Sequence, residues 1–190
     1  MRTVEEVFND RTCYKFSQKE VSQELVKQIY DTMKLGPTSA NCCPLRIIFV
    51  TSQEQREKLA RCAMDANAER IRACPVTVIF AYDMKFYELL PKLFPHNIGI
   101  KDYFSSDPEI IASNAMRNST LQAAYFMMIA RSHNLACGPM SGFDANAINE
   151  QFLAGTDYKV NFLCNIGYRE GTNEYPKSPR LEFDEACTII

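Results

Sequence analysis

The feature that most constrains the fold is the stretch from Leu121 to Ala130, which is apolar on nearly every face of a helix. It lies within a longer helical stretch that runs towards Asn134 and begins at Asp107-Pro108, a helix cap followed by a first-turn proline. A helix that is apolar all round must be buried on all sides. A chain of 190 residues provides one hydrophobic core, so we expect part of this helix to pack against a partner chain.

Three further apolar runs predict buried strands, because each is rich in β-branched and aromatic residues and bounded by proline or polar residues. They are residues 47–50, 75–82 and 160–168. A helix is expected after the first run, with Ser52 as its N-cap and Gln55 three residues later. Helices outnumber strands along the chain. We therefore predict an α+β sandwich around a small mixed sheet rather than a doubly wound fold.

An amphipathic helix is predicted from Val21 to Leu35, because apolar residues recur about every four positions and Gly36-Pro37 ends the pattern. A loop is expected to follow it. Asp144 is placed to cap a later helix that ends near Gly155. Residues 84–107 predict short helices and loops, and the chain from residue 169 onward predicts an extended tail.

Charge and hydropathy exclude several classes of partner. The 21 Lys and Arg residues nearly cancel the 23 Asp and Glu residues. No basic run with interleaved aromatic residues is present, so we do not expect nucleic-acid binding. No window holds the roughly 18 consecutive apolar residues of a membrane span, and the first residues do not resemble a signal peptide. We expect a cytoplasmic protein in which residues 1–190 form a single domain.

The eight cysteines contain no Cys-x-x-Cys pair, and no histidine lies at metal-motif spacing from a cysteine pair. A metal site is therefore not expected. Several cysteines lie in apolar runs, where a thiol packs as a small hydrophobic group. Reduced thiols in a cytosolic protein are the favoured interpretation.

Dinucleotide-binding loops and hydrolytic triads are absent from the sequence. The seven glycines form neither a Gly-x-Gly-x-x-Gly turn nor a phosphate loop, so a nicotinamide cofactor is not held by either motif. His133, near a predicted helix end, is expected to cap that helix rather than to react. His96 lies among aromatic residues, where it either lines a pocket or belongs to a plain loop.

Four separated polar clusters are more informative. They are Arg11-Thr12, Pro37-Thr38-Ser39-Ala40-Asn41, Asn67 with Arg70, and Gly138-Pro139-Met140-Ser141-Gly142-Phe143, and Arg180 follows in the tail. Their order and spacing resemble the nitroreductase family of flavin mononucleotide (FMN) enzymes over essentially the whole chain. The segments Phe94-Pro95-His96, Arg117-Asn118-Ser119 and Gln122-Ala123-Ala124-Tyr125 are similar to the compact subgroup that contains the malonic semialdehyde reductase of bacterial pyrimidine degradation.

The resemblance assigns the FMN phosphate to Arg11, Thr12 and Arg180. Guanidinium groups and a hydroxyl suit a phosphate that carries close to two negative charges. Taken alone, each arginine is more simply explained as half of a surface salt bridge. Many family members carry a basic residue shortly after the Thr12 position, and here only Lys15 supplies one.

The resemblance also implies a flavin wall formed by Pro37, Thr38, Ser39 and Asn41, although Asn41 by itself is explained as a turn residue. Asn41 and Asn67 offer donors and acceptors to the polar edge and ribityl chain of the flavin. Arg70 is expected to stabilise negative charge on the reduced ring.

A turn formed by Pro139, Met140, Ser141 and Gly142 is expected to bring backbone N–H groups against the flavin, and Gly142 permits such close approach. Without the resemblance, this segment is a tight turn between two helices. In many family members a Gln-Pro-Trp sequence follows the loop motif, whereas this chain has Cys43-Pro44-Leu45.

The family chemistry is ping-pong transfer of hydride from NADH or NADPH, through FMN, to a small acceptor such as a nitro compound, a quinone or malonic semialdehyde. No catalytic side chain is implied, because the flavin carries the reaction. The resemblance further implies a three-layer sandwich and an intertwined homodimer with an exchanged C-terminal tail. Residues 84–103 are expected to roof the pocket, with substrate contacts from Phe86, Phe94, His96 and Tyr103.

Two other functions are compatible with the residues. One is a non-catalytic flavin-binding store or redox sensor that uses the adjacent Cys42 and Cys43. The other is a thiol-based redox or metal protein, which a colourless, flavin-free preparation would support.

Overall fold

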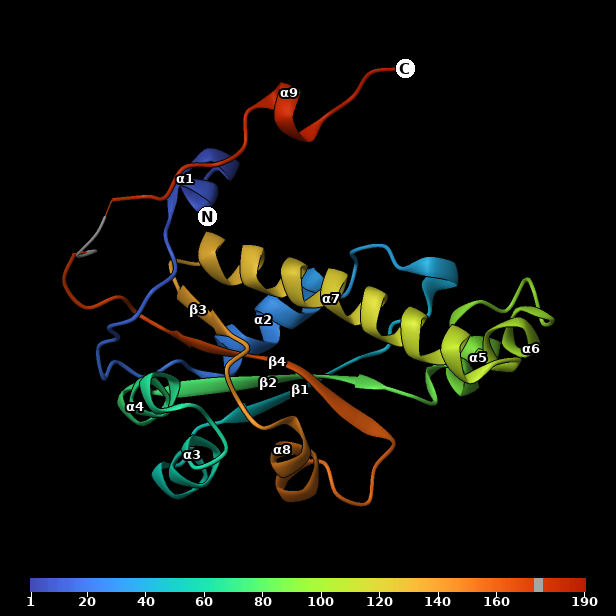
Figure 1. Ribbon diagram of the computed structural model, residues 1–190, viewed down its shortest axis with the longest axis horizontal. Helices are drawn as coiled ribbons and strands as arrows, with labels where there is room; N and C mark the ends of the chain where they lie inside the picture. The colour runs from blue at the N-terminus through green and yellow to red at the C-terminus, as the bar shows by residue number, and fades with distance from the viewer. Residues whose placement is uncertain (173–175) are drawn as a thin grey trace.

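A four-stranded sheet forms the middle layer of the computed structural model, which describes residues 1–172 and 176–190 (Figure 1). The strands are β1 (Leu45–Val50), β2 (Val76–Asp83), β3 (Ala136–Met140) and β4 (Tyr158–Gly167). They lie in the order β1-β2-β4-β3, and every neighbouring pair is antiparallel. The α+β sandwich is confirmed, but the sheet is antiparallel throughout and not mixed.

The connections between strands explain this direction. A pair of helices, α3 (Gln53–Ala60) and α4 (Asp65–Ala73), links β1 to β2, and Val50 at the end of β1 lies opposite Thr77 at the start of β2. The chain thus re-enters the sheet at the end from which it left. A strand that starts beside the end of its neighbour must run in the opposite direction.

The strand β3 was not predicted, because glycine and proline inside a short segment disfavour a strand. β3 pairs only with β4, so it is an edge strand, where the missing N–H of Pro139 is tolerated. The expected turn from Pro139 to Gly142 is therefore corrected. Pro139 and Met140 belong to the strand, and only Ser141 and Gly142 lie beyond its end.

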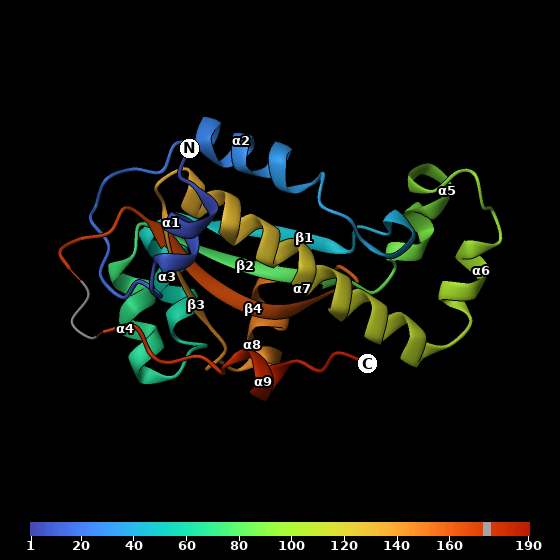
Figure 2. The ribbon, with the colours of Figure 1, turned by 90° about the horizontal axis from the view of Figure 1, so that it is seen from above.

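Two helices, α2 (Gln23–Met33) and α7 (Pro108–Ser132), cover one face of the sheet (Figure 2). The predicted caps of α7 are confirmed, since the Asp107 side chain accepts from the Glu109 N–H and His133 is the C-cap. The core beneath α7 includes Phe126, whose ring centre lies 5.4 Å from that of Phe80 on β2. The side of α7 turned away from the sheet stays open, where Met116 and Leu121 are 45% and 42% exposed.

Three helices cover the opposite face of the sheet, namely α3, α4 and α8 (Ala145–Phe152). The predicted N-caps are confirmed, because the Ser52 hydroxyl accepts from the Gln55 N–H and the Asp144 carboxylate accepts from the N–H groups at the start of α8. α8 ends at Phe152, slightly before the predicted end near Gly155. The second core lies between these helices and the sheet.

Short helices gather beyond one end of the sheet, as predicted for residues 84–107. They are the 3-10 helices η1 (Ser39–Asn41) and η2 (Phe86–Leu89), and the α-helices α5 (Leu90–Leu93) and α6 (Ile100–Ser105). A third core forms among them and the start of α7, around Phe86, Leu90 and Phe104.

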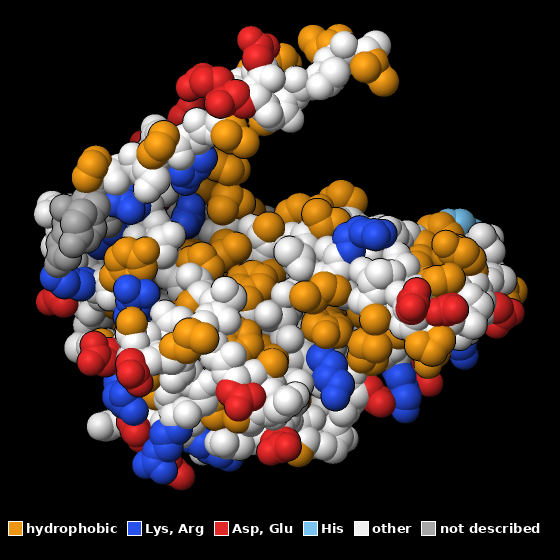
Figure 3. Space-filling model, in the orientation of Figure 1, with side chains coloured by type: hydrophobic (Ala, Val, Ile, Leu, Met, Phe, Trp, Pro, Cys, Tyr) orange, Lys and Arg blue, Asp and Glu red, His pale blue; other side chains and the backbone are white. Residues whose placement is uncertain are grey.

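The N-terminal segment and the start of the tail lie together at the other end of the sheet. The first helix, α1 (Val4–Asn9), lies near the tail that carries α9 (Phe183–Ala186) (Figure 1). All residues from 176 to 190 are exposed, and Figure 3 shows the tail standing away from the body over a hollow. The expected extended tail includes residues 173–175, which lie outside the described residues. No helix in the described ranges has the length and apolarity needed to cross a bilayer.

Candidate functional site

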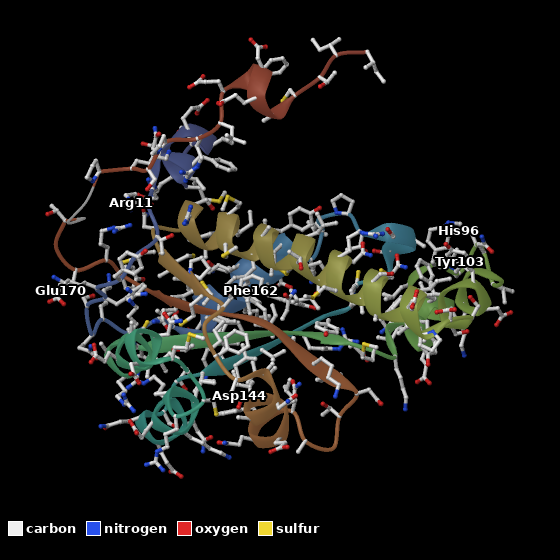
Figure 4. All side chains as sticks on the ribbon, in the orientation of Figure 1. Arg11, His96, Tyr103, Asp144, Phe162 and Glu170 are labelled. Atoms are coloured by element: carbon white, nitrogen blue, oxygen red, sulfur yellow. The ribbon has the colours of Figure 1, made fainter. Side chains whose placement is uncertain are left out.

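A cationic cavity of about 600 Å³ lies where the N-terminal segment, the end of α7 and the tail meet. It brings together Arg11, Thr12 and Arg180, which are far apart in the sequence. The other described lining residues are Phe8, Asp10, Tyr14, Arg131, Lys177 and Ser178. Figure 4 shows Arg11 at this end of the molecule, beside the root of the tail.

Positive charge dominates this cavity. Four of the described lining residues are Lys or Arg, and their only carboxylate is Asp10, which forms an ion pair with Arg2. Guanidinium and ammonium groups favour an anion that brings acceptor oxygens. A phosphate monoester fits this set of donors.

The tail contributes to the cavity through short contacts. The Nζ of Lys177 donates to the Phe8 carbonyl at 2.8 Å, which ties the tail to α1. One η nitrogen of Arg180 donates to the carbonyls of Ser178 and Pro179 at 2.9 and 3.0 Å. Lys15, which was also predicted to bind the cofactor, is exposed and is not among the described residues that line the cavity.

A second cluster adjoins the cavity and joins α4 to the end of β3. The Nδ2 of Asn67 donates to the Gly142 carbonyl at 3.1 Å, and Arg70 donates to the Oδ1 of Asn67 at 3.3 Å. The Arg70 guanidinium lies 4.2 Å from the ring centre of Tyr14, which also lines the cavity. The structure therefore places the predicted residues Asn67, Arg70 and Gly142 in contact. Ser141 is exposed beside them.

The predicted flavin-wall loop is held by the buried face of α7. The Oδ1 of Asn118 accepts from the Ser39 N–H at 2.9 Å, and the Oε1 of Gln122 accepts from the Leu45 N–H at 3.0 Å. Asn118 and Gln122 are four residues apart on one helix face and are both buried. Polar side chains on a buried helix face thus anchor both ends of the loop.

The loop has a specific and strained backbone. Tyr125 donates its hydroxyl to the Pro37 carbonyl at 3.1 Å. Ala40 and Asn41 adopt positive φ values of 46° and 51°, which is uncommon for a residue with a side chain and needs support from its surroundings. Asn41 supplies part of that support by donating to the Leu93 carbonyl at 2.8 Å. The side-chain amide of Asn41 is therefore directed at α5.

The loop packs along the middle of α7, whereas the cationic cavity lies at the C-terminal end of that helix. The loop contacts α7 through Asn118 and Tyr125, which are thirteen and six residues before Arg131. These separations correspond to roughly 20 and 9 Å along the helix axis. Within one chain, the predicted wall residues are not among the described residues that line the cavity.

The two adjacent cysteines differ in environment. Cys42 is fully buried, and burial raises the pKa of its thiol to about 12. Cys43 has a positive φ of 41° and lines a smaller cavity of about 320 Å³ together with Asn41 and Gln122. Its backbone N–H donates to the Thr38 hydroxyl at 3.3 Å. A buried thiol with a raised pKa is poorly suited to redox sensing.

The predicted substrate residues differ in how far they are buried. Phe86 has no exposed surface and lies inside the third core, so the structure gives it a packing role and removes it from the set that could touch a substrate. His96 is exposed, and its ring centre lies 3.9 Å from that of Phe94. Tyr103 is 58% exposed. Figure 4 shows His96 and Tyr103 at the end of the molecule opposite Arg11.

Several residues of these sites received no individual role from the sequence. They are Tyr14, Asn118, Gln122, Arg131 and Lys177. For three of them a signal existed, because a polar side chain within an apolar helix must find a partner when it is buried. Tyr14 and Lys177 offered no such signal, since their positions depend on how the N-terminal segment meets the start of the tail. Over the described ranges, no group of three or more His, Cys, Asp or Glu side chains is arranged to hold a metal ion.

The sequence matches the model of the nitroreductase family over residues 9–168. A curated protein of Polynucleobacter asymbioticus, provisionally named NADH dehydrogenase/NAD(P)H nitroreductase, is 47% identical over 95% of this chain and 91% of its own length. A protein of Ralstonia pickettii with a similar provisional name is 46% identical over 90% of this chain and 88% of its own.

Solved structures show the same fold. A nitroreductase family protein from Streptococcus pneumoniae superposes with a TM-score of 0.85 at 19% identity, covering 98% of this chain and all of that one. A provisionally named nitroreductase from Exiguobacterium sibiricum, solved in complex with FMN, gives a TM-score of 0.86 at 21% identity and covers 100% of this chain and 98% of its own. On its sequence match and its fold, this chain belongs to the nitroreductase family.

Proposed function

We propose that this protein binds FMN and uses it to pass hydride from NADH or NADPH to a small electrophilic acceptor. The observation that carries the proposal is the cationic cavity, which brings Arg11, Thr12 and Arg180 together. Relatives named NAD(P)H nitroreductase and a structural neighbour that holds FMN support the same chemistry. When bound, FMN supplies the ring that accepts and donates hydride, and the protein supplies binding and electrostatics.

The phosphate is assigned to the cationic cavity. Arg11 and Arg180 provide guanidinium groups from the two ends of the chain, and Thr12 provides a hydroxyl. Lys15 lies outside the described lining and is proposed to act only at the rim, through its charge. An ion pair with a doubly charged phosphate is stronger than a neutral hydrogen bond, so this end of the site is proposed to provide most of the affinity.

The cluster of Asn67, Arg70 and Gly142 is proposed to face the pyrimidine edge of the flavin. Arg70 is held by Asn67 and by the Tyr14 ring, so its positive charge is fixed near the cavity. A fixed cation favours negative charge that develops on the reduced ring. The end of β3 at Pro139 and Met140 positions Ser141 and Gly142, whose backbone N–H groups are proposed to approach the flavin.

A homodimer is proposed to complete the site. Pro37, Thr38, Ser39 and Asn41 are proposed to form a flavin wall, but this loop packs on the middle of α7, roughly 9–20 Å along the helix axis from Arg131 in the cavity of the same chain. A second copy can bring its loop to the cavity without any change of fold. Exposed apolar side chains on α7, with Leu121 at 42%, and on the tail, with Phe183 at 61%, support a partner that covers them.

The dimer proposal is tested by charge substitution on the open faces. Leu121→Glu and Phe183→Glu are expected to lower the dimer fraction in analytical ultracentrifugation. The control is Ile98→Glu, which changes an equally apolar residue that is 83% exposed on the loop before α6. A wild-type protein that sediments as a monomer at micromolar concentration would contradict both the dimer and the exchange of its tail.

The acceptor is proposed to bind under residues 84–103, against Phe94, His96 and Tyr103. Nitro compounds, quinones and aldehydes such as malonic semialdehyde are all compatible, because related folds vary their substrates through pocket residues. Two half-reactions at one flavin give ping-pong kinetics. Double-reciprocal plots of rate against donor concentration, taken at several acceptor concentrations, are then parallel. Two further predictions from the sequence stand as proposals, namely that residues 1–190 act as one domain and that the protein is cytoplasmic.

One experiment separates the candidate functions. The purified protein is expected to be yellow, to lose its flavin absorbance on addition of NADH or NADPH under anaerobic conditions, and to regain it with an acceptor. Bound flavin that resists both nicotinamides would instead favour a non-catalytic flavin store. Failure to bind FMN at all would contradict the proposal, and metal in such a colourless preparation would favour a metal protein.

A further inference from the structure

Arg70, in the last turn of α4, is a partly buried cation without a carboxylate partner among the described residues. Arg72, two residues further along the same helix, pairs with Glu57 at 2.7 Å. Over residues 1–172 and 176–190, by contrast, no carboxylate lies within ion-pair distance of Arg70. Its guanidinium donates instead to the Oδ1 of Asn67 at 3.3 Å and lies over the ring of Tyr14, 4.2 Å from the ring centre. Within the described chain the positive charge of Arg70 is therefore not neutralised.

The backbone at Arg70 is attached to the centre of the sheet. The Nδ2 of Asn165 on β4 donates to the Arg70 carbonyl at 3.0 Å, and the Oδ1 of the same amide accepts from the Thr77 hydroxyl on β2 at 2.7 Å. Asn165 and Thr77 are both buried. The start of the Arg70 side chain is therefore fixed, and the position of its charge depends on what holds the guanidinium at the far end.

A neutral ring beside a cation acts differently from a carboxylate. A carboxylate attracts a guanidinium, but its own negative charge cancels most of the positive potential that a third group nearby experiences. The face of an aromatic ring attracts the cation through its quadrupole and adds no net charge. Tyr14 therefore restricts the Arg70 guanidinium and leaves its charge available to a ligand. Because Tyr14 also lines the cationic cavity, this charge is held beside that cavity.

We propose that Tyr14 is a positioning residue, which holds Arg70 as a cation that is not neutralised beside the pyrimidine edge of the flavin. This inference rests on the proposed function. A cation that is already in place stabilises the negative charge of the reduced ring without reorganisation. Reduced FMN then binds more tightly relative to oxidised FMN, which raises the reduction potential of the bound flavin. Tyr14 acts through Arg70, and its hydroxyl has no part in the effect.

The reduction potential of the bound flavin tests this role, measured on the FMN-loaded protein by equilibration with a reference dye. Tyr14→Leu removes the aromatic face and keeps an apolar side chain. It is expected to raise the Kd of reduced FMN relative to that of oxidised FMN about two- to fivefold, the range for one exposed cation–π contact. For a two-electron couple, this change in the ratio lowers the potential by about 9–21 mV. Tyr14→Phe keeps the aromatic face and is expected to keep the potential.

Tyr30→Leu is the matched control. Tyr30 is 48% exposed and Tyr14 is 47% exposed, so the two substitutions remove a ring of similar accessibility. Tyr30 also lies beside a cation, Lys34, but that cation pairs with Asp31 and neither residue is among the described residues that line the cationic cavity. Tyr30→Leu is expected to leave the reduction potential unchanged.

A double variant separates positioning from the other roles of a tyrosine at this place. Arg70→Gln is expected to lower the potential, and Tyr14→Leu is expected to have no further effect in that background. A purely structural role for Tyr14 predicts that oxidised and reduced FMN lose affinity together, at an unchanged potential. Direct contact between Tyr14 and the flavin predicts the same shift with and without Arg70. Either result overturns the inference.

NMR of the full-length apoprotein separates this inference from the proposed function. Protons that lie over an aromatic ring are shifted upfield, so the Nε–H signal of Arg70, identified by its loss in Arg70→Gln, is expected to be shifted in the wild type and in Tyr14→Phe. The shift is expected to vanish in Tyr14→Leu. If the wild type binds no flavin, the proposed function fails, and this signal still decides whether Tyr14 holds Arg70. An Arg70 signal that Tyr14→Leu does not move overturns that role.

Discussion

Gly36 is the position at which a single methyl group should disturb the predicted flavin wall. It lies between the end of α2 and Pro37, and a Cβ there would be 2.2 Å from Cδ2, 2.5 Å from Cε2 and 2.9 Å from Cγ of Tyr125. Ordinary van der Waals contacts begin at 3.4 Å, so the nearest ring carbon would have to move away by about 1.2 Å. Because Cγ is also too close, ring rotation alone does not relieve the clash.

The expected cost of Gly36→Ala combines three effects. Overpacking costs about 1–3 kcal/mol, and loss of the Tyr125–Pro37 hydrogen bond costs about 0.5–1.5 kcal/mol. Lower entropy of the unfolded chain offsets roughly 0.4–1 kcal/mol. Gly36 does not have a positive φ, so backbone strain adds nothing. We expect a net loss of roughly 0.5–4 kcal/mol, and a Tm lower by about 1–16 °C for a chain of this size.

Urea denaturation at one fixed protein concentration measures this loss, and a double-mutant cycle with Tyr125→Ala assigns its cause. The double variant is expected to be more stable than the sum of the single effects by about 1–3 kcal/mol, since removing the ring removes the clash. Gly155→Ala is the control, because Gly155 has a φ of 77° and nothing within 4 Å of its added Cβ. It should show only a backbone cost of about 1–2 kcal/mol. A neutral or stabilising Gly36→Ala, or strict additivity in the cycle, would refute the reasoning.

Three further predictions follow from burial and contact. Asn118→Ala is expected to destabilise the protein by about 1–3 kcal/mol in urea denaturation, because this buried amide holds the loop, and unchanged stability would contradict it. Burial raises the pKa of Cys42 to about 12, so Cys42 stays a thiol at pH 8. Iodoacetamide should therefore modify the exposed Cys187 and leave Cys42 unmodified, as measured by peptide mass analysis. Rapid labelling of Cys42 would refute this. Gly142→Ala places a Cβ 2.8 Å from the Nδ2 of Asn67, so FMN binding should weaken at least about tenfold in fluorescence titration, and unchanged affinity would count against the proposed pyrimidine site.

The helix ends were predictable because their causes are local. Ser52, Asp107 and Asp144 each bond to N–H groups two or three residues ahead, so the sequence neighbourhood contains the whole interaction. The central strand β2 was predictable for a related reason. It is buried along nearly its whole length, and its residues are therefore almost all apolar. Edge strand β3 was not, because its stability comes from pairing with β4, a partner distant in the sequence.

The sequence alone determined the family resemblance, the α+β class and the residue types of each polar cluster, because motifs and hydrophobic periodicity involve residues that are close together in the sequence. Only the tertiary structure decided which clusters meet. It joined Arg11, Thr12 and Arg180 with Arg131 in one cavity, and it placed the Pro37–Asn41 loop against the middle of α7, outside the described lining of that cavity. It also turned Phe86 into the core. These outcomes depend on how the helices pack on the sheet and on where the N-terminal segment meets the start of the tail. Such contacts join residues that are far apart in the sequence, so no local sequence pattern predicts them.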